Sequence, residues 1–187
     1  MTEYLIGVAA AALVNYATLS RRAGEDDILT RLRRAAYLGG ATVCVTLVSS
    51  FAAYFLYYGG LSPLGLQSSG AILFLLSATL CAAGAGFLFR FANGAFAAFV
   101  ETDWPLLAMN GVIFGVGVHA AGVGYGFTWT VLTALGASAM FAASLLALTA
   151  IDARLDPDAM PKAVRGWPAL FLSAALIAMA LTAFAGF

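Results

Sequence analysis

Two apolar segments, YLIGVAAAALVNYATLS at residues 4–20 and PLLAMNGVIFGVGV at residues 105–118, decide the fold of this chain. Each segment is short and carries one asparagine, Asn15 in the first and Asn110 in the second. An amide in hydrocarbon is costly unless it has a hydrogen-bond partner. Short or interrupted segments at corresponding positions of two halves are typical of membrane proteins built from inverted repeats. The pair therefore predicts two helix breaks at a repeat interface.

The composition is that of an integral membrane protein. Of 187 residues, 63% are hydrophobic and 10% are charged, and the mean hydropathy is +0.94. A soluble domain has about 25% charged residues. Nine basic and nine acidic residues balance, which argues against nucleic acid as a partner. Because the apolar runs are long and continuous, they favour α-helices over the short alternating strands of a membrane barrel.

Six apolar segments are expected to cross the membrane. They are Tyr4–Ser20, Ala35–Tyr58, Gly70–Phe89, Pro105–Val118, Thr128–Ile151 and Trp167–Phe187. All nine basic residues fall in the loops after the first, third and fifth segments: Arg21, Arg22, Arg31, Arg33, Arg34, Arg90, Arg154, Lys162 and Arg165. The positive-inside rule places these loops in the cytoplasm and both termini in the periplasm of a bacterial inner membrane. Asp152 is assigned to the last of these solvated loops.

The second half of the chain is expected to repeat the first in the opposite orientation. Three segments precede the Arg90–Pro105 loop and three follow it, so the two halves start on opposite faces. This predicts one membrane domain, residues 1–187, with inverted three-helix repeats at about 1–90 and 105–187. Asn110 follows Asn15 by 95 residues, in the matching segment. Six glycines between residues 111 and 126 indicate that the fourth segment is a half-helix continuing into irregular backbone.

Several motifs resemble the RnfA-type membrane subunits of the Rnf/Nqr family, in the same order and with similar spacing. They are Met1–Leu5, Leu13–Asn15, Pro63–Gly65, Trp104–Gly115 and Pro161–Gly166 continuing to Ala183–Phe187. The resemblance implies a subunit of an ion-translocating electron-transport complex with six spans, broken first and fourth helices, and an oppositely oriented homologue as partner. It also implies that each subunit contributes two cysteines to a [2Fe–2S] cluster, which relays electrons across the membrane.

This chain departs from the family at those two cysteines. The first ligand position falls at about Asp26 and the second at Gly111. A carboxylate is a poor ligand for a cluster held by thiolates, and glycine has no side chain to offer. The acidic run Glu25–Asp27, between arginines, is typical of a solvated turn. We therefore expect that this chain alone binds neither the [2Fe–2S] cluster nor another cofactor or metal.

Three other residues are weaker candidates for a site. Cys44 and Cys81 lack the spacing of metal ligands and are interpreted as buried small hydrophobes. The alternative is a replacement cluster shared with a partner. His119 could relay protons or bind haem or chlorophyll, although a single histidine is more often an interfacial side chain. Asn15 and Asn110 could instead line an ion or electron path, but capping of the broken helices is favoured.

The sequence contains no nucleophile–base pair, phosphate loop or paired catalytic carboxylates, so an independent enzyme is not indicated. At most, the chain is a non-catalytic subunit of a redox-driven, ion-translocating oxidoreductase. The first hypothesis is an RnfA-like membrane subunit of such an electron-transport complex that does not ligate the cluster. The alternative is a redox-inactive paralogue that serves as a scaffold in another respiratory or photosynthetic complex. Its partners would be other integral membrane subunits and membrane lipid.

Overall fold

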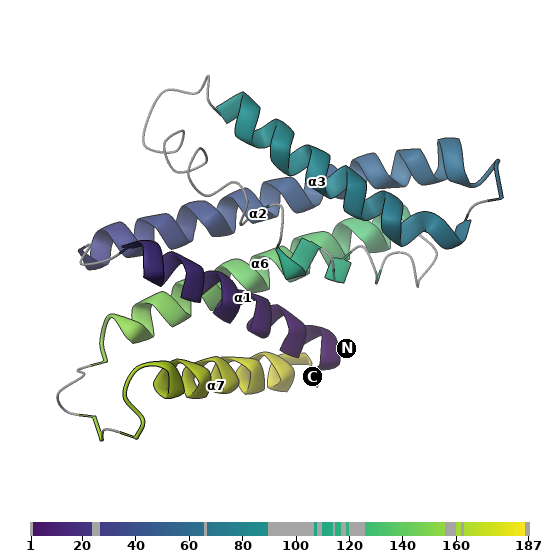
Figure 1. The fold of residues 1–187 in the computed structure, drawn as a ribbon. Coiled ribbons are helices and arrows are strands. Elements are labelled where there is room, and N and C mark those ends of the chain that lie inside the picture. The colour runs from purple at the N-terminus through teal and green to yellow at the C-terminus, as the bar shows by residue number, and fades with distance from the viewer. Residues whose placement is uncertain are drawn as a thin grey trace. The chain divides into compact units, whose positions relative to one another are not determined.

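The computed structural model is helical wherever it is described. The described residues are 2–23, 27–65, 67–89, 107, 110–113, 115–116, 119, 126–155, 160–161 and 163–185. They form α1 (Thr2–Ala23), α2 (Ile28–Leu56), α3 (Gly70–Phe89), α6 (Phe127–Asp152) and α7 (Trp167–Ala185), as Figure 1 shows. A π-helical turn, η1 (Tyr57–Leu61), continues α2, and a 3-10 turn, η2 (Gln67–Ser69), precedes α3. Since this part of the chain contains no strand, the predicted all-α class is confirmed.

Two helical stretches, Ile28–Gly60 and Phe127–Asp152, are long and apolar enough to cross a membrane. With a rise of 1.5 Å per residue, the 26 residues of α6 extend over about 39 Å, more than the roughly 30 Å of a hydrocarbon core. Shorter apolar stretches lie at Ile6–Ser20, Ile72–Gly84 and Trp167–Ala183. Half of the expected fourth segment, residues 105–118, lies outside the described residues.

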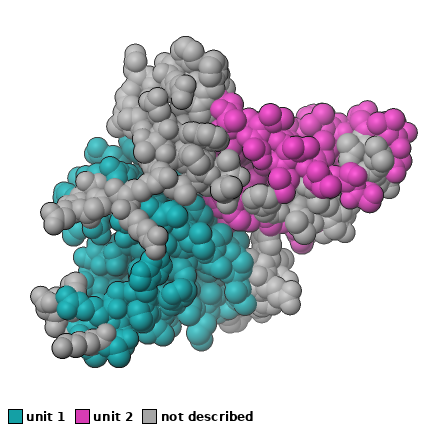
Figure 2. Space-filling model, viewed as in Figure 1, with its two compact units in different colours: residues 1–39, 140–187 teal, residues 40–139 magenta. Residues whose placement is uncertain are grey.

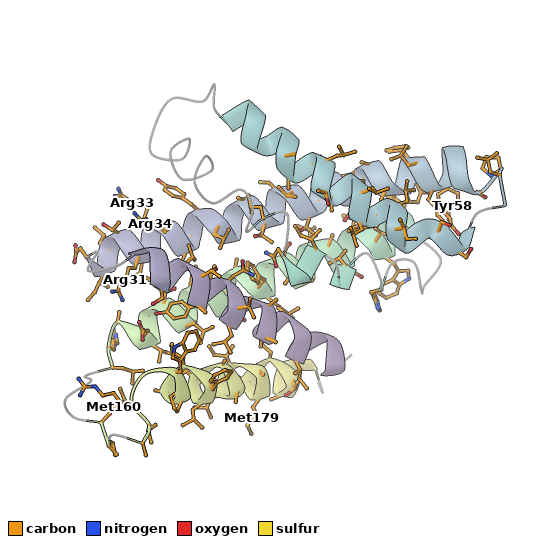
Figure 3. All side chains as sticks on the ribbon, in the orientation of Figure 1. Arg31, Arg33, Arg34, Tyr58, Met160 and Met179 are labelled. Carbon is orange, nitrogen blue, oxygen red and sulfur yellow. The ribbon has the colours of Figure 1, made fainter. Side chains whose placement is uncertain are left out.

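Helix α2 begins earlier than the hydropathy pattern predicts, at Ile28 rather than Ala35. The expectation that Arg31, Arg33 and Arg34 lie in a loop is therefore wrong, because they occupy its first two turns (Figure 3). The carbonyl of Asp27 accepts hydrogen bonds from the N–H groups of Thr30 and Arg31, which starts the helix. Arginine has a high helix propensity, and its long stem lets the guanidinium reach water. A charged end can therefore extend an apolar helix.

The helices divide between two compact units that do not follow the order of the chain. Unit 1 contains residues 1–39 and 140–187, and unit 2 contains residues 40–139 (Figure 2). As a result, α2 and α6 each contribute one part to unit 1 and the other part to unit 2.

Each unit has its own apolar core. In unit 1, α1 packs against α7. The largest fully buried side chains of this unit are Leu38, Phe141, Leu145 and Leu148. Those of unit 2 are Phe74, Leu107, Val112 and Val116.

Helices α2 and α6 approach each other closely within unit 1. A Cβ atom at Gly39 would lie 2.8 Å from the Cβ of Ala142, whereas one at the next residue, Gly40, would have no atom within 4 Å. Small residues at helix contacts are usual in membrane proteins, since they let the backbones come close. The contact therefore requires glycine at position 39 and not at position 40.

Candidate functional site

In unit 2, Asn110 starts a helical stretch and ties it to α2. Its side-chain oxygen accepts a hydrogen bond from the N–H of Val112 at 3.1 Å, and its carbonyl accepts one from the N–H of Ile113 at 3.1 Å. Asn110 itself is not helical, whereas residues 111–113 are, which is the arrangement of an N-cap. The Nδ2 group donates to the Oγ1 of Thr42 at 3.1 Å, and both side chains are fully buried. The amide is therefore satisfied from two elements.

Thr42 is the first of a row of buried hydroxyl groups on α2. The hydroxyl of Thr46 donates to the carbonyl of Thr42, and those of Ser49 and Ser50 donate to the carbonyl of Thr46. On α3, Ser77 donates to the carbonyl of Phe74 at 2.8 Å. Since carbonyls of the preceding turn take up these donors, the hydroxyls are satisfied inside the helices and need no ligand.

The expected helix break at Asn15 is not observed, because α1 runs through this residue without interruption. The buried Nδ2 group of Asn15 donates to the carbonyl of Ala11, one turn earlier in the same helix, at 2.9 Å. If the expected repeat offset of 95 residues is applied to Thr42, its counterpart is Ala137, which has no hydroxyl to accept such a bond. An internal backbone partner lets α1 carry the amide without a break. The two asparagines thus have different roles.

The residues at the family's cluster positions do not fit a [2Fe–2S] cluster. Gly111 is the first helical residue after Asn110, and it has no side chain that could bind iron. Asp26 lies outside the described residues. Among the residues that the structure describes, no three His, Cys, Asp or Glu side chains form a group that could hold a metal ion. A carboxylate and a glycine at the two ligand positions differ from the thiolates that such clusters require.

The two cysteines and the histidine lie on accessible surfaces. Cys44 on α2 is exposed and Cys81 on α3 is partly exposed, and neither forms a disulfide. The expected burial is therefore wrong for Cys44, because a helix that is apolar on all sides does not reveal which face turns inward. His119 is exposed. A role for it in proton transfer or pigment binding stays a prediction.

The structure adds a polar cluster in unit 1 that the sequence did not predict. The hydroxyl of Tyr16 on α1 donates to the carboxylate of Asp152, and Nη1 of Arg31 on α2 lies 3.6 Å from the same carboxylate oxygen. Tyr16 is 3% exposed, and the side chains of Arg31 and Asp152 are each 27% exposed. Asp152 is the last residue of α6, not part of a solvated loop as expected. One sequence pattern could have indicated this cluster. Asp152 is a single carboxylate at the end of an apolar segment, and it was expected on the same membrane face as the arginines.

These features define a helical membrane protein whose buried polar groups tie helices together. Over its whole length it is similar to curated A subunits of ion-translocating oxidoreductase complexes. It is 28% identical to the RnfA-type subunit of the Na(+)-translocating ferredoxin:NAD(+) oxidoreductase complex of Acetobacterium woodii, over 94% of this chain and 93% of that protein. It is 27% and 26% identical to the corresponding subunits of the ion-translocating oxidoreductase complexes of Syntrophotalea carbinolica and of Aromatoleum aromaticum, over 100% of this chain and 98% of each relative. No family model matches the chain.

Replacing Asn110 with alanine should destabilise the protein more than replacing Asn15. The Asn110→Ala variant loses an N-cap, which contributes about 1 kcal/mol, and an interhelical bond of about 0.6 kcal/mol. Asn15→Ala removes one bond within a helix and adds the residue with the highest helix propensity, so its effect should be close to zero. Unfolding of the full chain in mixed detergent micelles measures both. Equal losses would contradict the capping role.

Proposed function

We propose that the chain takes the place of the RnfA subunit in an ion-translocating oxidoreductase complex and holds no iron–sulfur cluster of its own. One observation carries this proposal. The similarity to the RnfA-type subunits extends over the full length of the chain, yet a cluster position of the family is Gly111, directly after the cap at Asn110. The helical frame is retained, whereas the residues that would bind iron are replaced.

The proposed architecture has six helices in two inverted repeats, in which α1 corresponds to the fourth segment, α2 to α6 and α3 to α7. The composition of the two units supports it. Unit 1 combines α1, the start of α2, the end of α6 and α7. Unit 2 combines the counterpart of each: the fourth segment, the start of α6, the end of α2 and α3. Such an exchange of equivalent parts is what a two-fold repeat requires.

In this proposal the chain lies in a bacterial inner membrane with its arginine-rich loops in the cytoplasm and both termini in the periplasm. Its partners are other integral membrane subunits, among them an oppositely oriented homologue. Any electrons that cross the membrane in such a complex pass through groups held by those partners. The role left to this chain is to pack against them and to fix their positions.

A second candidate function is supported by the same replaced ligands. A paralogue that holds no cluster could serve as a scaffold in another respiratory or photosynthetic membrane complex. It would then be associated with cytochrome or pigment subunits rather than with the redox subunits of an ion pump.

Co-purification distinguishes the two functions. We expect the tagged full chain, extracted in mild detergent, to retain flavin-bearing and ferredoxin-like subunits. Cytochrome or pigment subunits in their place would support the scaffold. In the purified complex, the double substitution Cys44→Ser with Cys81→Ser should leave the iron content and the electron paramagnetic resonance spectrum unchanged, because neither thiol binds iron. Loss of a stoichiometric [2Fe–2S] signal would contradict the proposal.

A further inference from the structure

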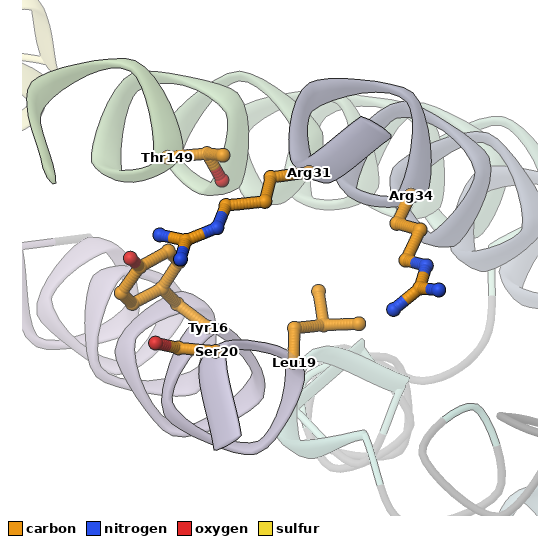
Figure 4. Close-up of a pocket in the computed structure, with 6 residues that line it drawn as sticks. All are labelled: Tyr16, Leu19, Ser20, Arg31, Arg34 and Thr149. Atoms are coloured by element: carbon orange, nitrogen blue, oxygen red, sulfur yellow. The ribbon is translucent and has the colours of Figure 1, made fainter. Parts of the chain in front are cut away.

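A small pocket in unit 1 lies beside Tyr16 and Arg31, among the last turns of α1, the first turns of α2 and the last turns of α6 (Figure 4). The enclosed space is about that of one water molecule. Figure 4 also shows that the guanidinium groups of Arg31 and Arg34 point apart. The pocket is therefore too small and too divided to hold a ligand, whereas unit 2 presents a broader accessible surface.

This surface of unit 2 consists of aromatic side chains where α2 passes into η1 and where α6 begins. The ring of Phe127 on α6 meets those of Phe51 and Tyr54 on α2, with centroids 5.6 and 5.1 Å apart. Tyr54 also meets Tyr58 at 4.7 Å. These separations are typical of packed aromatic pairs. We refer to the connected group as the aromatic patch: Phe51, Tyr54, Phe55, Tyr57, Tyr58 and Phe127.

The aromatic patch is accessible and uncharged. Phe55 is 67% exposed, and Tyr58, which Figure 3 labels beside the turn to α3, is exposed as well. The turn adds Leu64, which is 72% exposed. Residues 35–89 and 104–151 contain no Asp, Glu, Lys or Arg, so neither the patch nor the turn carries one of these charges. An exposed apolar surface of this kind marks a contact with a membrane or with another protein.

We propose that the aromatic patch binds the lipid interface of the bilayer, the boundary between headgroups and acyl chains, and holds the turn between α2 and α3 in that layer rather than in water. Tyr54 follows Arg34 by 20 residues in α2, which at 1.5 Å per residue is about 30 Å, the thickness of a hydrocarbon core. With Arg34 at one boundary, the patch falls at the other.

The side chains of the patch suit this layer. Tyrosine combines an apolar ring with a hydroxyl group that can face water, and it is enriched at membrane interfaces. The position along α2 and the absence of charge therefore favour lipid as the occupant over another protein. This inference rests on the membrane location of the chain, and not on the complex to which the chain belongs.

The test measures the depth of single tryptophan reporters in the full chain, reconstituted in phosphatidylcholine vesicles. Trp104, Trp129 and Trp167 are replaced with phenylalanine, and Tyr58→Trp or Leu64→Trp introduces one reporter at an exposed position. The quenchers are lipids with bromine near the headgroup, lipids with bromine near the end of the acyl chain, and iodide in water. We expect the shallow bromine to quench both reporters about twofold more than the deep bromine, and iodide to quench them about half as strongly as free tryptophan, or less.

Cys44→Trp is the matched control. Cys44 is exposed on the same helix and precedes Tyr54 by ten residues, which places it about 15 Å deeper, near the middle of the bilayer. Its reporter should be quenched more by the deep bromine. Phosphatidylglycerol in place of half of the phosphatidylcholine should leave all ratios unchanged, because the patch is uncharged. Each reporter is measured separately, so Leu64→Trp decides the test if Tyr58→Trp does not fold.

Four results would overturn the proposal. Quenching of Leu64→Trp by iodide and by neither lipid would place the turn in water. Protection of Tyr58→Trp from all three quenchers would indicate that protein covers the patch. Equal quenching of Tyr58→Trp and Cys44→Trp by the deep bromine would place the patch inside the hydrocarbon. A change of the ratios with phosphatidylglycerol would indicate that charge, and not the aromatic rings, sets the depth.

Discussion

Gly39→Ala is expected to lower the free energy of unfolding by about 1 to 3 kcal/mol, the usual cost of an extra methyl group in a tightly packed contact. The added Cβ would lie 2.8 Å from the Cβ of Ala142, closer than real Cβ atoms approach, and it would also meet the Cα of Ala142 at 3.1 Å. Because backbone is involved, a rotamer change cannot relieve the clash. Helices α2 and α6 would have to move apart within unit 1.

Two further variants make this result specific. Gly40→Ala meets no atom within 4 Å and should be neutral or stabilising by up to about 1 kcal/mol, the difference in helix propensity between the two residues. Ala142→Gly should recover much of the stability lost in Gly39→Ala, which a double-mutant cycle in mixed micelles would measure. A loss at Gly40 equal to that at Gly39 would rule out a role for this contact.

Asp152→Ala is expected to destabilise the protein by about 2 kcal/mol, because it removes the acceptor of the Tyr16 hydroxyl and the ion-pair partner of Arg31. The hydroxyl of Tyr16 is buried and loses its partner, whereas Arg31 is 27% exposed and can be hydrated instead. This partial exposure keeps the loss below the roughly 3 to 5 kcal/mol typical of breaking a fully buried ion pair. Thermal unfolding of the full chain in detergent measures the effect.

The neighbouring charge Arg154 provides the control. It is exposed and lies two residues after Asp152, so Arg154→Ala should change the stability by less than about 0.5 kcal/mol. Tyr16→Phe removes the hydroxyl and keeps the ion pair of Arg31 with Asp152, and should cost about 1 kcal/mol. If Asp152→Ala costs no more than Arg154→Ala, the carboxylate does not hold these helices together.

The apolar segments could be predicted from the sequence because burial in hydrocarbon requires long runs of apolar residues. The observed α3 spans Gly70–Phe89, as predicted, and α6 differs from the expected segment by one residue at each end. The start of α2 could not be predicted in this way. Its first turns depend on helix propensity and on hydrogen bonds to the carbonyl of Asp27, and hydropathy measures neither.

The candidate site was predictable only in part. Asn110 was expected at a helix break, because it lies in a short apolar segment that is followed by several glycines. Its partner Thr42 lies 68 residues away, and such a pairing depends on how the helices pack. The same holds for Tyr16 and Asp152, which are 136 residues apart. For Asn15 the sequence predicted a helix break that is not there. Its amide donates to a carbonyl of its own helix, so the helix can continue through it.

The division of the chain into units has a consequence for biosynthesis. Unit 2 is one continuous segment, residues 40–139, whereas unit 1 needs both residues 1–39 and residues 140–187. At 5–20 residues per second, the ribosome takes roughly 2 to 10 s to add the final segment. During this interval α1 has been made, whereas α7, against which it packs, is not yet complete. The nascent protein therefore has to shield its first helix with lipid or with an insertion factor until its last helix arrives.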